Sequence, residues 1–450
     1  MKEPSDALTI QDKLVSDIYQ RAQSVAVECV RKTATVGPDI DSRLDNVLTS
    51  KIFGFPIMIV LLGAVLWITV AGANYPSQVL AAALFWVEAR LTELFQWLGA
   101  PAWIHGALVL GGYRTLAWVV AVMLPPMAIF FPCFTLLEDL GYLARVSFNL
   151  DWFFRKSGAH GKQALTMAMG LGCNAAGVMA CRIIDSPRER LIAIITNTFA
   201  VCNGRFPTLI TLASFMAIGL ARPGLCPAVS SLVVVAMVLL GIMATFAVSW
   251  VLSKTLLCGV PSSFILELPS YRRPQVSNIL VRSLRDRTML VLRRAVVVAA
   301  PAGVVVWILG NVSIHGCSVI GHTARFLTPV ATAMGLDGLI LTAFILGLPA
   351  NEIVLPILAM GYLSRGSLVD VGDSAFLAGT LTANGWTWFT ALNTMLFSVL
   401  HFPCSTTILT IARETRSLKW TLLSVIIPLS VAVGACSALT LAARWAGMVR

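Results

Sequence analysis

Two short glycine-containing stretches inside apolar segments place the strongest constraint on how this chain can fold. The first reads Gly-Leu-Gly-Cys-Asn at residues 170–174, and the second reads Gly-Leu-Pro-Ala-Asn at residues 347–351. Glycine costs a helix interior about 1 kcal/mol and proline about 3 kcal/mol, so both segments are predicted to break at the same relative position. Paired breaks in the two halves of an apolar chain are typical of a transporter's binding site. We therefore expect a pathway for a small polar or cationic solute between the two breaks.

The composition predicts a membrane protein with several helical spans. Of 450 residues, 57% are hydrophobic and 12% are charged, with a mean hydropathy of +0.81, which is too apolar for an ordinary soluble domain. The net charge of +11 arises from short basic clusters between apolar segments, as the positive-inside rule requires, and this argues against nucleic acid as a partner. The ten cysteines lack the spacing of a zinc site or a CxxC pair, and the polar N-terminus lacks the pattern of a cleavable signal peptide.

The apolar segments predict an all-α polytopic protein built as an inverted repeat. A cytoplasmic amphipathic helix and linker at residues 1–50 precede a transmembrane permease domain at residues 51–450, with repeat one at about 112–252 and repeat two at about 295–446. The spans are predicted at residues 54–73, 116–137, 191–219, 228–252, 295–312, 386–411 and 420–443. Residues 77–107, which carry several tryptophans and charges, and a piece ending at residue 335 are expected to lie at the membrane interface.

The basic residues decide how the two broken segments, 164–181 and 338–362, are oriented. If the first segment crossed the membrane, Arg182, Arg188 and Arg190 would lie outside, against the positive-inside rule. A re-entrant hairpin that enters and returns removes the conflict. The same reasoning makes the second segment a hairpin that enters from the opposite side, with the N-terminus of the chain in the cytoplasm.

The candidate pathway residues are polar or sulfur-containing side chains next to the breaks. Sulfur, carboxamide and carboxylate donors together suit a borderline divalent ion such as Fe²⁺, and an ionised carboxylate inside a span costs about 2.5–3.5 kcal/mol, which makes it a functional candidate. The pathway candidates are Cys173, Asn174, Cys202, Glu352 and Cys404; the secondary candidates are His401, Asn351, Glu138 and Asp139; the predicted breaks are Gly170, Gly172, Gly204, Pro207, Gly347, Pro349 and Pro403.

Each candidate also has a structural alternative. Any one of the cysteines can equally be a small apolar core residue. His401 either bonds a backbone carbonyl or adds a nitrogen ligand. The two acidic residues at 138 and 139 either take part in the pathway or form a salt bridge to Arg145 or to a neighbouring basic loop. For Arg205 we favour a structural role, because a buried cation would repel a metal ion.

The motifs resemble those of a known family, the membrane domain of the bacterial ferrous iron transport protein B (FeoB), whose paired Gate regions are related to nucleoside transporters. Residues 137–145 read LEDLGYLAR, similar to the family's LEDxGYxAR, and residues 170–174 resemble its GFGCN. Cys202, Arg205 and Pro207 fall where the family has SCGARLP, residues 347–352 resemble its GLPAKE, and residues 403–404 fall on its late PC. The resemblance covers roughly residues 35–446. The chain departs from the pattern at Ala175-Ala176, at Val201 and at Asn351, where the family has an apolar residue and proline, a serine and a lysine.

The resemblance implies a multi-pass permease of the bacterial inner membrane with Fe²⁺ as the transported ion and no permanently bound cofactor. The family normally carries an N-terminal GTP-binding domain, but the nearest glycine-lysine stretch here, residues 158–163, lacks the Ser or Thr of a phosphate loop. We therefore expect this chain not to be an enzyme. The expected partners are membrane lipid, a separate GTPase subunit or small accessory iron-transport protein, and a second copy of the chain.

Two other functions remain open at this point. The chain could be a transporter of nucleosides or other organic solutes if the carboxamides and Glu352 bind a sugar or base and the cysteines are inert. It could also be a non-transporting membrane assembly factor of the Gate lineage. An intramembrane enzyme is disfavoured, because the sequence has no HExxH and no GxSxG motif.

Overall fold

The computed structural model describes residues 4–29, 40–50, 52–220, 226–259, 275–314, 316–364, 366–368 and 374–447. The linker at residues 30–39 of the predicted N-terminal segment lies outside the described residues, as does the part of the predicted basic loop at residues 260–274. In the described part, nearly all regular structure is helical, and the strands β1 (Ser313–Ile314) and β2 (Cys317–Ser318) form one short antiparallel ribbon. The prediction of an all-α protein is therefore confirmed.

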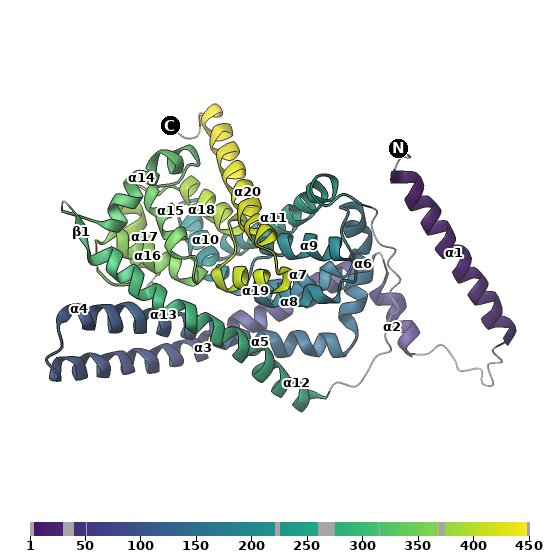
Figure 1. Ribbon diagram of the computed structural model, residues 1–450, viewed down its shortest axis with the longest axis horizontal. Coiled ribbons are helices and arrows are strands. Elements are labelled where there is room, and N and C mark those ends of the chain that lie inside the picture. The colour runs from purple at the N-terminus through teal and green to yellow at the C-terminus, as the bar shows by residue number, and fades with distance from the viewer. Residues whose placement is uncertain are drawn as a thin grey trace.

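The chain begins with an amphipathic helix, as predicted, and then forms a long antiparallel pair of helices, α3 and α5, that lie side by side (Figure 1). The elements of this N-terminal part are α1 (Pro4–Cys29), α2 (Ile40–Leu48), α3 (Gly54–Trp97), α4 (Ala102–His105), the π-helix η1 (Gly106–Tyr113), α5 (Arg114–Asp139) and α6 (Tyr142–Lys156).

Residues 77–97, predicted to form an interfacial helix separate from the first span, instead continue that span as one helix. Helix α3 continues without a break through Pro76 to Trp97 over 44 residues, which at 1.5 Å per residue is about 66 Å, roughly twice the hydrocarbon thickness of a bilayer. Glu88, which indicated an interface, is instead 8% exposed and pairs with Arg114 of α5 at 3.5 Å. The charge is thus satisfied between the two helices, so it does not need to lie in a polar headgroup layer.

The remaining elements form two sets of similar helices joined by a connecting segment. The first set contains α7 (Gln163–Gly172), α8 (Asn174–Ala180), η2 (Cys181–Ile183), α9 (Pro187–Thr196), η3 (Asn197–Phe199), η4 (Asn203–Arg205), α10 (Phe206–Leu220) and α11 (Cys226–Lys254). The connecting segment contains α12 (Val276–Arg282), the π-helix η5 (Ser283–Thr288), α13 (Met289–Asn311), the two strands and α14 (Val319–Ala333). The second set contains α15 (Gly338–Leu346), η6 (Asn351–Ile353), α16 (Val354–Tyr362), α17 (Ser374–Ala383), α18 (Trp388–Leu400), α19 (Ser405–Thr415) and α20 (Leu418–Trp445).

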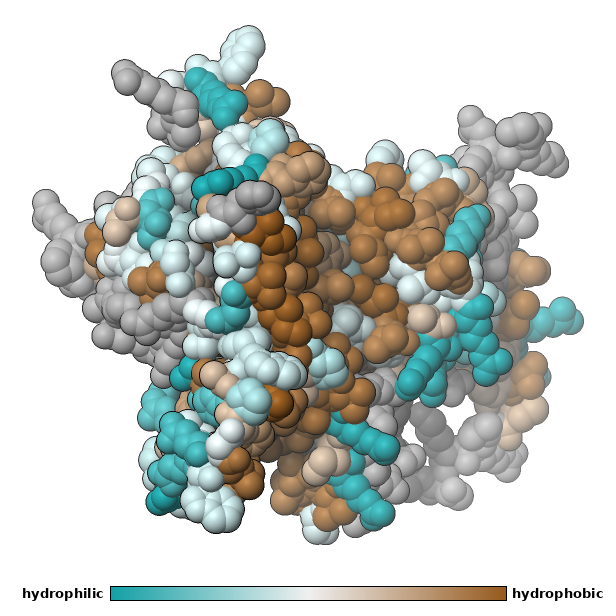
Figure 2. All heavy atoms as spheres, turned by 60° about the vertical axis from the view of Figure 1, so that its left-hand side comes forward, coloured by the Kyte–Doolittle hydropathy of each residue, from teal (hydrophilic) through white to brown (hydrophobic). Residues whose placement is uncertain are grey.

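The described residues contain six helical segments long and apolar enough to cross a membrane, or up to seven if the bent pair α14 and α15 counts as one span. The six are Gly54–Trp97, Ala102–Asp139, Pro187–Ile218, Val229–Lys254, Trp388–Thr415 and Leu418–Trp445. The span predicted at residues 295–312 corresponds to a shorter apolar helix, Val296–Asn311. Hydrophobic side chains cover much of the face seen in Figure 2. Large hydrophobic side chains elsewhere in the described residues are also exposed, and Phe326 is 81% exposed. The chain is therefore a multi-pass membrane protein.

The two predicted breaks occur at equivalent residues with the same backbone conformation. Cys173, between α7 and α8, has φ −155° and ψ 123°, and Ala350, before η6, has φ −154° and ψ 124°. Both residues have an extended backbone conformation and interrupt a helical segment at a single position. Within each segment the chain then folds back on itself, since Gly177 of α8 packs against the carbonyl of Thr166 in α7, and Gly361 of α16 packs against Leu339 of α15. We call α7–α8 the first hairpin and α15–η6–α16 the second hairpin.

The hairpins enter the protein from opposite ends of the broken span formed by α18 and α19. At the open end of the first hairpin, Arg182 forms two short bonds to Glu414 at the end of α19, at 2.6 and 2.8 Å. At the open end of the second hairpin, the Tyr362 hydroxyl accepts a hydrogen bond of 2.8 Å from Trp386, just before α18. The tips of both hairpins meet near the middle of this span. The open ends of the two hairpins thus lie at opposite ends of this span, as entry from opposite sides would require.

The two broken spans, α9–α10 and α18–α19, run antiparallel to each other. Ile194 of α9 packs in one cluster with Ile411 of α19, whereas Phe215 of α10 contacts Trp386 at the start of α18. The first half of one span therefore lies beside the second half of the other, which is the arrangement that an inverted repeat produces.

Candidate functional site

The tips of the two hairpins and the breaks of both spans enclose a small cavity of about 30 Å³. The three cysteines, Asn174, Asn351 and Glu352 all line it, although they come from segments up to about 230 residues apart in the chain. The complete lining is Met123, Met127, Gly172, Cys173, Asn174, Cys202, Gly204, Pro349, Ala350, Asn351, Glu352, Cys404 and Thr406. A water molecule needs roughly 10–15 Å³ by this measure, so the space suits a water or a single ion with little of its hydration shell.

The chemically active side chains all lie at the N-terminal ends of helices. Cys173 precedes α8, Cys202 precedes η4 and α10, Cys404 precedes α19, and Glu352 lies in the turn η6 that opens into α16. Free backbone N–H groups and the helix dipole make each such end favourable for negative charge. These helix ends therefore offset part of the cost of burying a thiolate or a carboxylate, the anionic forms that bind a metal cation.

Close packing at two glycines sets the shape of the cavity. A Cβ atom on Gly204 would fall on the carboxylate of Glu352, and one on Gly172 would fall on the ring of Phe130 in α5. Larger residues at either position would push the second hairpin or α5 away from the site. The glycines predicted as helix breaks thus also let three segments approach one another closely.

Asn174, predicted as a pathway residue, also forms structural hydrogen bonds that the sequence did not indicate. In the amide orientation that satisfies its hydrogen bonds, the side-chain nitrogen donates to the carbonyls of Gly170, Asn197 and Ala200 at 3.1–3.2 Å, and the side-chain nitrogen of Asn197 donates in return to the Asn174 carbonyl at 3.0 Å. The amide oxygen of Asn174 then takes the opposite position. Asn174 therefore joins the first hairpin to the break of the first span.

Arg205 connects the two broken spans and lies outside the cavity lining. It is fully buried, at 0% exposed, and its two terminal nitrogens donate to the carbonyls of Thr198, Val399, His401 and Phe402 at 2.9–3.4 Å. Three of these carbonyls lie at the C-terminal end of α18, where a helix leaves acceptors unpaired and favours positive charge. The structural role favoured for Arg205 is the one that its bonds support.

The secondary candidates mostly lie away from the cavity. The Nδ1 atom of His401 bonds the carbonyl of Ser398 at 2.8 Å, and the ring packs against Phe344, Phe397 and Phe402. The backbone-bonded alternative for this histidine is thus the one observed, and only Asn351 among the secondary candidates lines the cavity.

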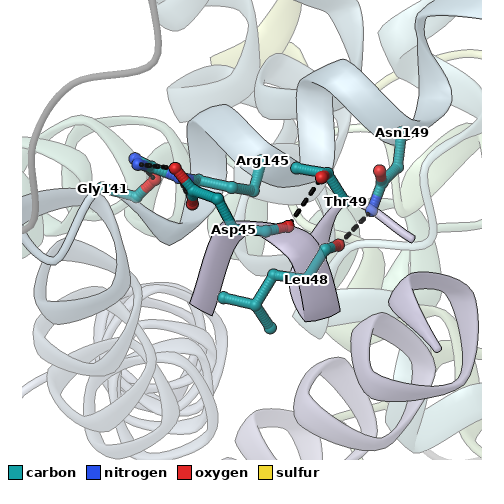
Figure 3. A network of polar contacts seen from close by, with 6 residues as sticks. All are labelled: Asp45, Leu48, Thr49, Gly141, Arg145 and Asn149. Atoms are coloured by element: carbon teal, nitrogen blue, oxygen red, sulfur yellow. Dashed lines mark hydrogen bonds and ion pairs between the residues drawn. The ribbon is translucent and has the colours of Figure 1, made fainter. Parts of the chain in front are cut away.

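The acidic pair at the end of α5 lies outside the cavity lining. Glu138 and Asp139 are exposed and do not line the cavity. Arg145 forms a bidentate ion pair with Asp45 of α2, at 2.9 and 3.2 Å, and also donates to the Gly141 carbonyl (Figure 3). Nearby, Asn149 donates to the Leu48 carbonyl, so this motif fastens α2 to α6.

Several predicted breaks are close to the cavity without lining it. Pro207 lies in the first turn of α10, where proline is tolerated, so the actual interruption is the extended stretch at residues 200–202. Pro403 lies in the extended segment before Cys404, Gly347 ends α15, and Gly170 packs against Asn197.

Four residues of the lining were not among the candidates: Met123, Met127, Ala350 and Thr406. The methionines belong to an apolar span, where nothing in the pattern separates a cavity residue from a lipid-facing one. Within the described residues, no three or more His, Cys, Asp or Glu side chains are arranged to hold a metal ion together.

The fold and the site define a class of protein: a multi-pass helical membrane protein in which paired hairpins and broken spans meet at a sulfur-lined cavity. The Gate family, described as "Nucleoside recognition", matches residues 120–219 and 292–418. The family "Ferrous iron transport protein B C terminus" matches residues 234–285. The chain therefore belongs to the Gate family, and its matches group its membrane region with that of ferrous iron transport protein B.

Relatives from several organisms cover most of this chain. The Fe(2+) transporter FeoB of Staphylococcus aureus (strain MSSA476) is 30% identical over an alignment of 432 residues that covers 92% of this chain and 61% of the relative. FeoB of Methanocaldococcus jannaschii is 26% identical over 426 residues, covering 92% of this chain and 60% of the relative. A Fe(2+) transport protein A/FeoB fusion protein of Porphyromonas gingivalis is 25% identical over 441 residues, covering 87% and 50%. The chain thus spans about 61% of the first of these relatives. No solved structure matches it.

Proposed function

We propose that this chain is a permease that conducts Fe²⁺ through the cavity between the two hairpins. The observation that carries the proposal is the convergence of Cys173, Cys202, Cys404 and Glu352 at helix N-termini around one cavity of about 30 Å³. Thiolate and carboxylate donors suit a borderline divalent cation. A permeating ion must be held weakly enough to leave, so two or three of these donors act at once and water completes the shell.

The size of the cavity argues against an organic solute in this conformation. Sites for small organic molecules usually enclose roughly 300–1,000 Å³, and even the lower limit is about ten times the volume of about 30 Å³ between the hairpin tips. The description of the Gate family as "Nucleoside recognition" keeps nucleosides as the second candidate, which requires a conformation in which the hairpins have moved apart.

Replacing the three cavity cysteines by serine is expected to reduce Fe²⁺ uptake at least about tenfold, the effect of losing roughly 1.4 kcal/mol of ion stabilisation. Serine keeps the size of the side chain but provides no thiolate. Uptake is measured anaerobically in proteoliposomes with ascorbate-reduced ⁵⁵Fe²⁺, and the matched control is the Cys226→Ser, Cys436→Ser double variant, whose cysteines do not line the cavity. If the triple variant transports Fe²⁺ normally, or if the vesicles take up a labelled nucleoside instead, the second candidate replaces the first.

The energy source and the partners of the permease are part of the same proposal. We take the phosphate loop to be missing from this chain, so a separate GTPase subunit or a small accessory protein regulates it, and a relative that is a fusion with Fe(2+) transport protein A supports an accessory protein of that kind. A second copy of the chain is a further expected partner. In the uptake assay, adding GTP to vesicles that hold only this chain is expected to leave the rate unchanged, and a GTP-stimulated rate would contradict this part.

We place the chain in the inner membrane with its N-terminus in the cytoplasm, because basic residues cluster at the open end of the first hairpin. In a chain whose exposed Cys29 and Cys258 are serine, a cysteine introduced by Asp185→Cys is expected to react with an impermeant maleimide only in inverted vesicles. One introduced by Asn384→Cys, which lies next to Trp386 at the other end of α18–α19, is expected to react only in whole cells. If the two introduced cysteines react in the opposite pattern, the proposed orientation of the chain in the membrane is reversed.

A further inference from the structure

One face of α5 is directed at the tip of the first hairpin, and it carries two methionines. Met123, Met127, Phe130 and Phe134 follow one another at helical spacing on this face. The ring of Phe130 fills the space left open by Gly172, and Met127 belongs to the same buried cluster as Cys173. The two methionines lie one and two turns further along this face, where both line the cavity.

The cavity wall therefore holds five sulfur-containing side chains, three cysteines and two methionines, from four separate segments. Thioether sulfur is a soft, polarisable and uncharged donor. It adds little to a hard or borderline divalent ion, which is held better by oxygen and thiolate, but it is a preferred donor of Cu(I). In a pathway that discriminates among cations, methionine side chains thus shift the selectivity from divalent ions towards Cu(I).

We propose that Met123 and Met127 make this cavity a binding site for a soft monovalent cation, Cu(I), which they hold together with the neighbouring cysteine thiols. The proposal rests on the proposed function, in that it takes the cavity to be a metal pathway. It adds a second ion class and assigns the selectivity to α5. Both methionine side chains come from a helix outside the hairpins, so they remain in place as a fixed wall when a hairpin moves.

Packing alone is the competing explanation for these methionines, since methionine fills irregular gaps in cores. Leucine separates the two explanations. It has nearly the same volume and is usually tolerated in place of methionine at a cost below about 1.5 kcal/mol, but it has no sulfur. A leucine at these positions therefore preserves the packing of the side chain but cannot act as a metal ligand.

The test is the affinity of the purified chain for Cu(I), measured anaerobically by competition with the chelator bicinchoninate. All variants carry Cys29→Ser and Cys258→Ser, which remove the two exposed thiols. The Met123→Leu, Met127→Leu double variant is expected to bind Cu(I) at least about tenfold more weakly than its parent, and the control Met237→Leu, a buried methionine of α11 outside the lining, is expected to bind like the parent.

Equal Cu(I) affinity in the parent and the double variant overturns the inference, whatever the outcome for iron. Fe²⁺ uptake in proteoliposomes is measured on the same proteins as a separate readout. If the parent shows no uptake of Fe²⁺ but a methionine-dependent Cu(I) affinity, the proposed function fails and the soft-cation site stands. If the parent takes up Fe²⁺ and its affinity for Cu(I) is unchanged by the two methionine substitutions, only the inference fails.

Discussion

Replacing Arg205 with leucine is expected to lower the free energy of unfolding by about 3 kcal/mol or more, because each buried acceptor left without a donor costs roughly 1–3 kcal/mol. Arg205 is the donor to four buried carbonyls, and these belong to both broken spans. The extended segments that connect α9 to α10 and α18 to α19 have few other means of pairing their backbone groups within a membrane. Loss of this one side chain therefore weakens the link between the two repeats.

The change can be measured by denaturant unfolding in mixed micelles, with Arg182→Leu as the matched control. Arg182 also forms two bonds, to Glu414, but its side chain is 70% exposed, and an exposed ion pair contributes only about 0–1 kcal/mol. If both variants unfold within about 1 kcal/mol of each other, the carbonyl bonds of Arg205 do not have the structural importance that we assign to them.

The Gly204→Ala variant is expected to lose nearly all Fe²⁺ uptake while remaining folded. Its new methyl group would overlap the Glu352 carboxylate, so the carboxylate must move into the cavity or the second hairpin must shift away from the cysteines. Because displacement of a binding group by 1 Å can cost about a hundredfold in rate, we expect a comparable loss of uptake in the proteoliposome assay.

Gly434→Ala in α20 provides the control, since nothing lies within 4 Å of the added methyl group. It has the same chemical change within a span and is expected to keep normal uptake. Equal uptake by both alanine variants would mean that the contact between Gly204 and Glu352 is not part of the route of the ion. The position of Glu352 at the cavity would then have no functional consequence.

The breaks and their meeting point could be predicted from the sequence because they depend on a few residues with large energetic effects. Glycine and proline at equivalent positions interrupt both helices, and the repeat symmetry brings the interruptions together, so Cys173, Cys202 and Cys404 were all expected near one another. The bonding partners of Arg205 could not be predicted, since a backbone carbonyl has the same sequence signature whether it is capped or not.

Charged residues in an apolar chain were a weak guide to position. Glu88 was taken to indicate an interface and Glu138 was a secondary pathway candidate, and the structure shows Glu138 outside the cavity lining. A charged residue in an apolar chain indicates only that an ionic partner or water lies nearby. The partner of Glu88 is Arg114, on another helix. Met123 and Met127 were missed for the converse reason, since a sulfur atom in an apolar side chain carries no hydropathy signal.

The matching backbone conformations at Cys173 and Ala350 have a consequence for the direction of transport. The two hairpins are equivalent in shape but different in chemistry, since the first presents a thiol at its bend and the second a methyl group followed by the Glu352 carboxylate. When an ion occupies the cavity, withdrawal of the first hairpin removes a sulfur donor and withdrawal of the second removes an oxygen donor. If the chain is the permease that we propose, this geometrically symmetric frame would release the ion to its two sides from unequal coordination shells, and we expect different ion affinities on the two sides of the membrane.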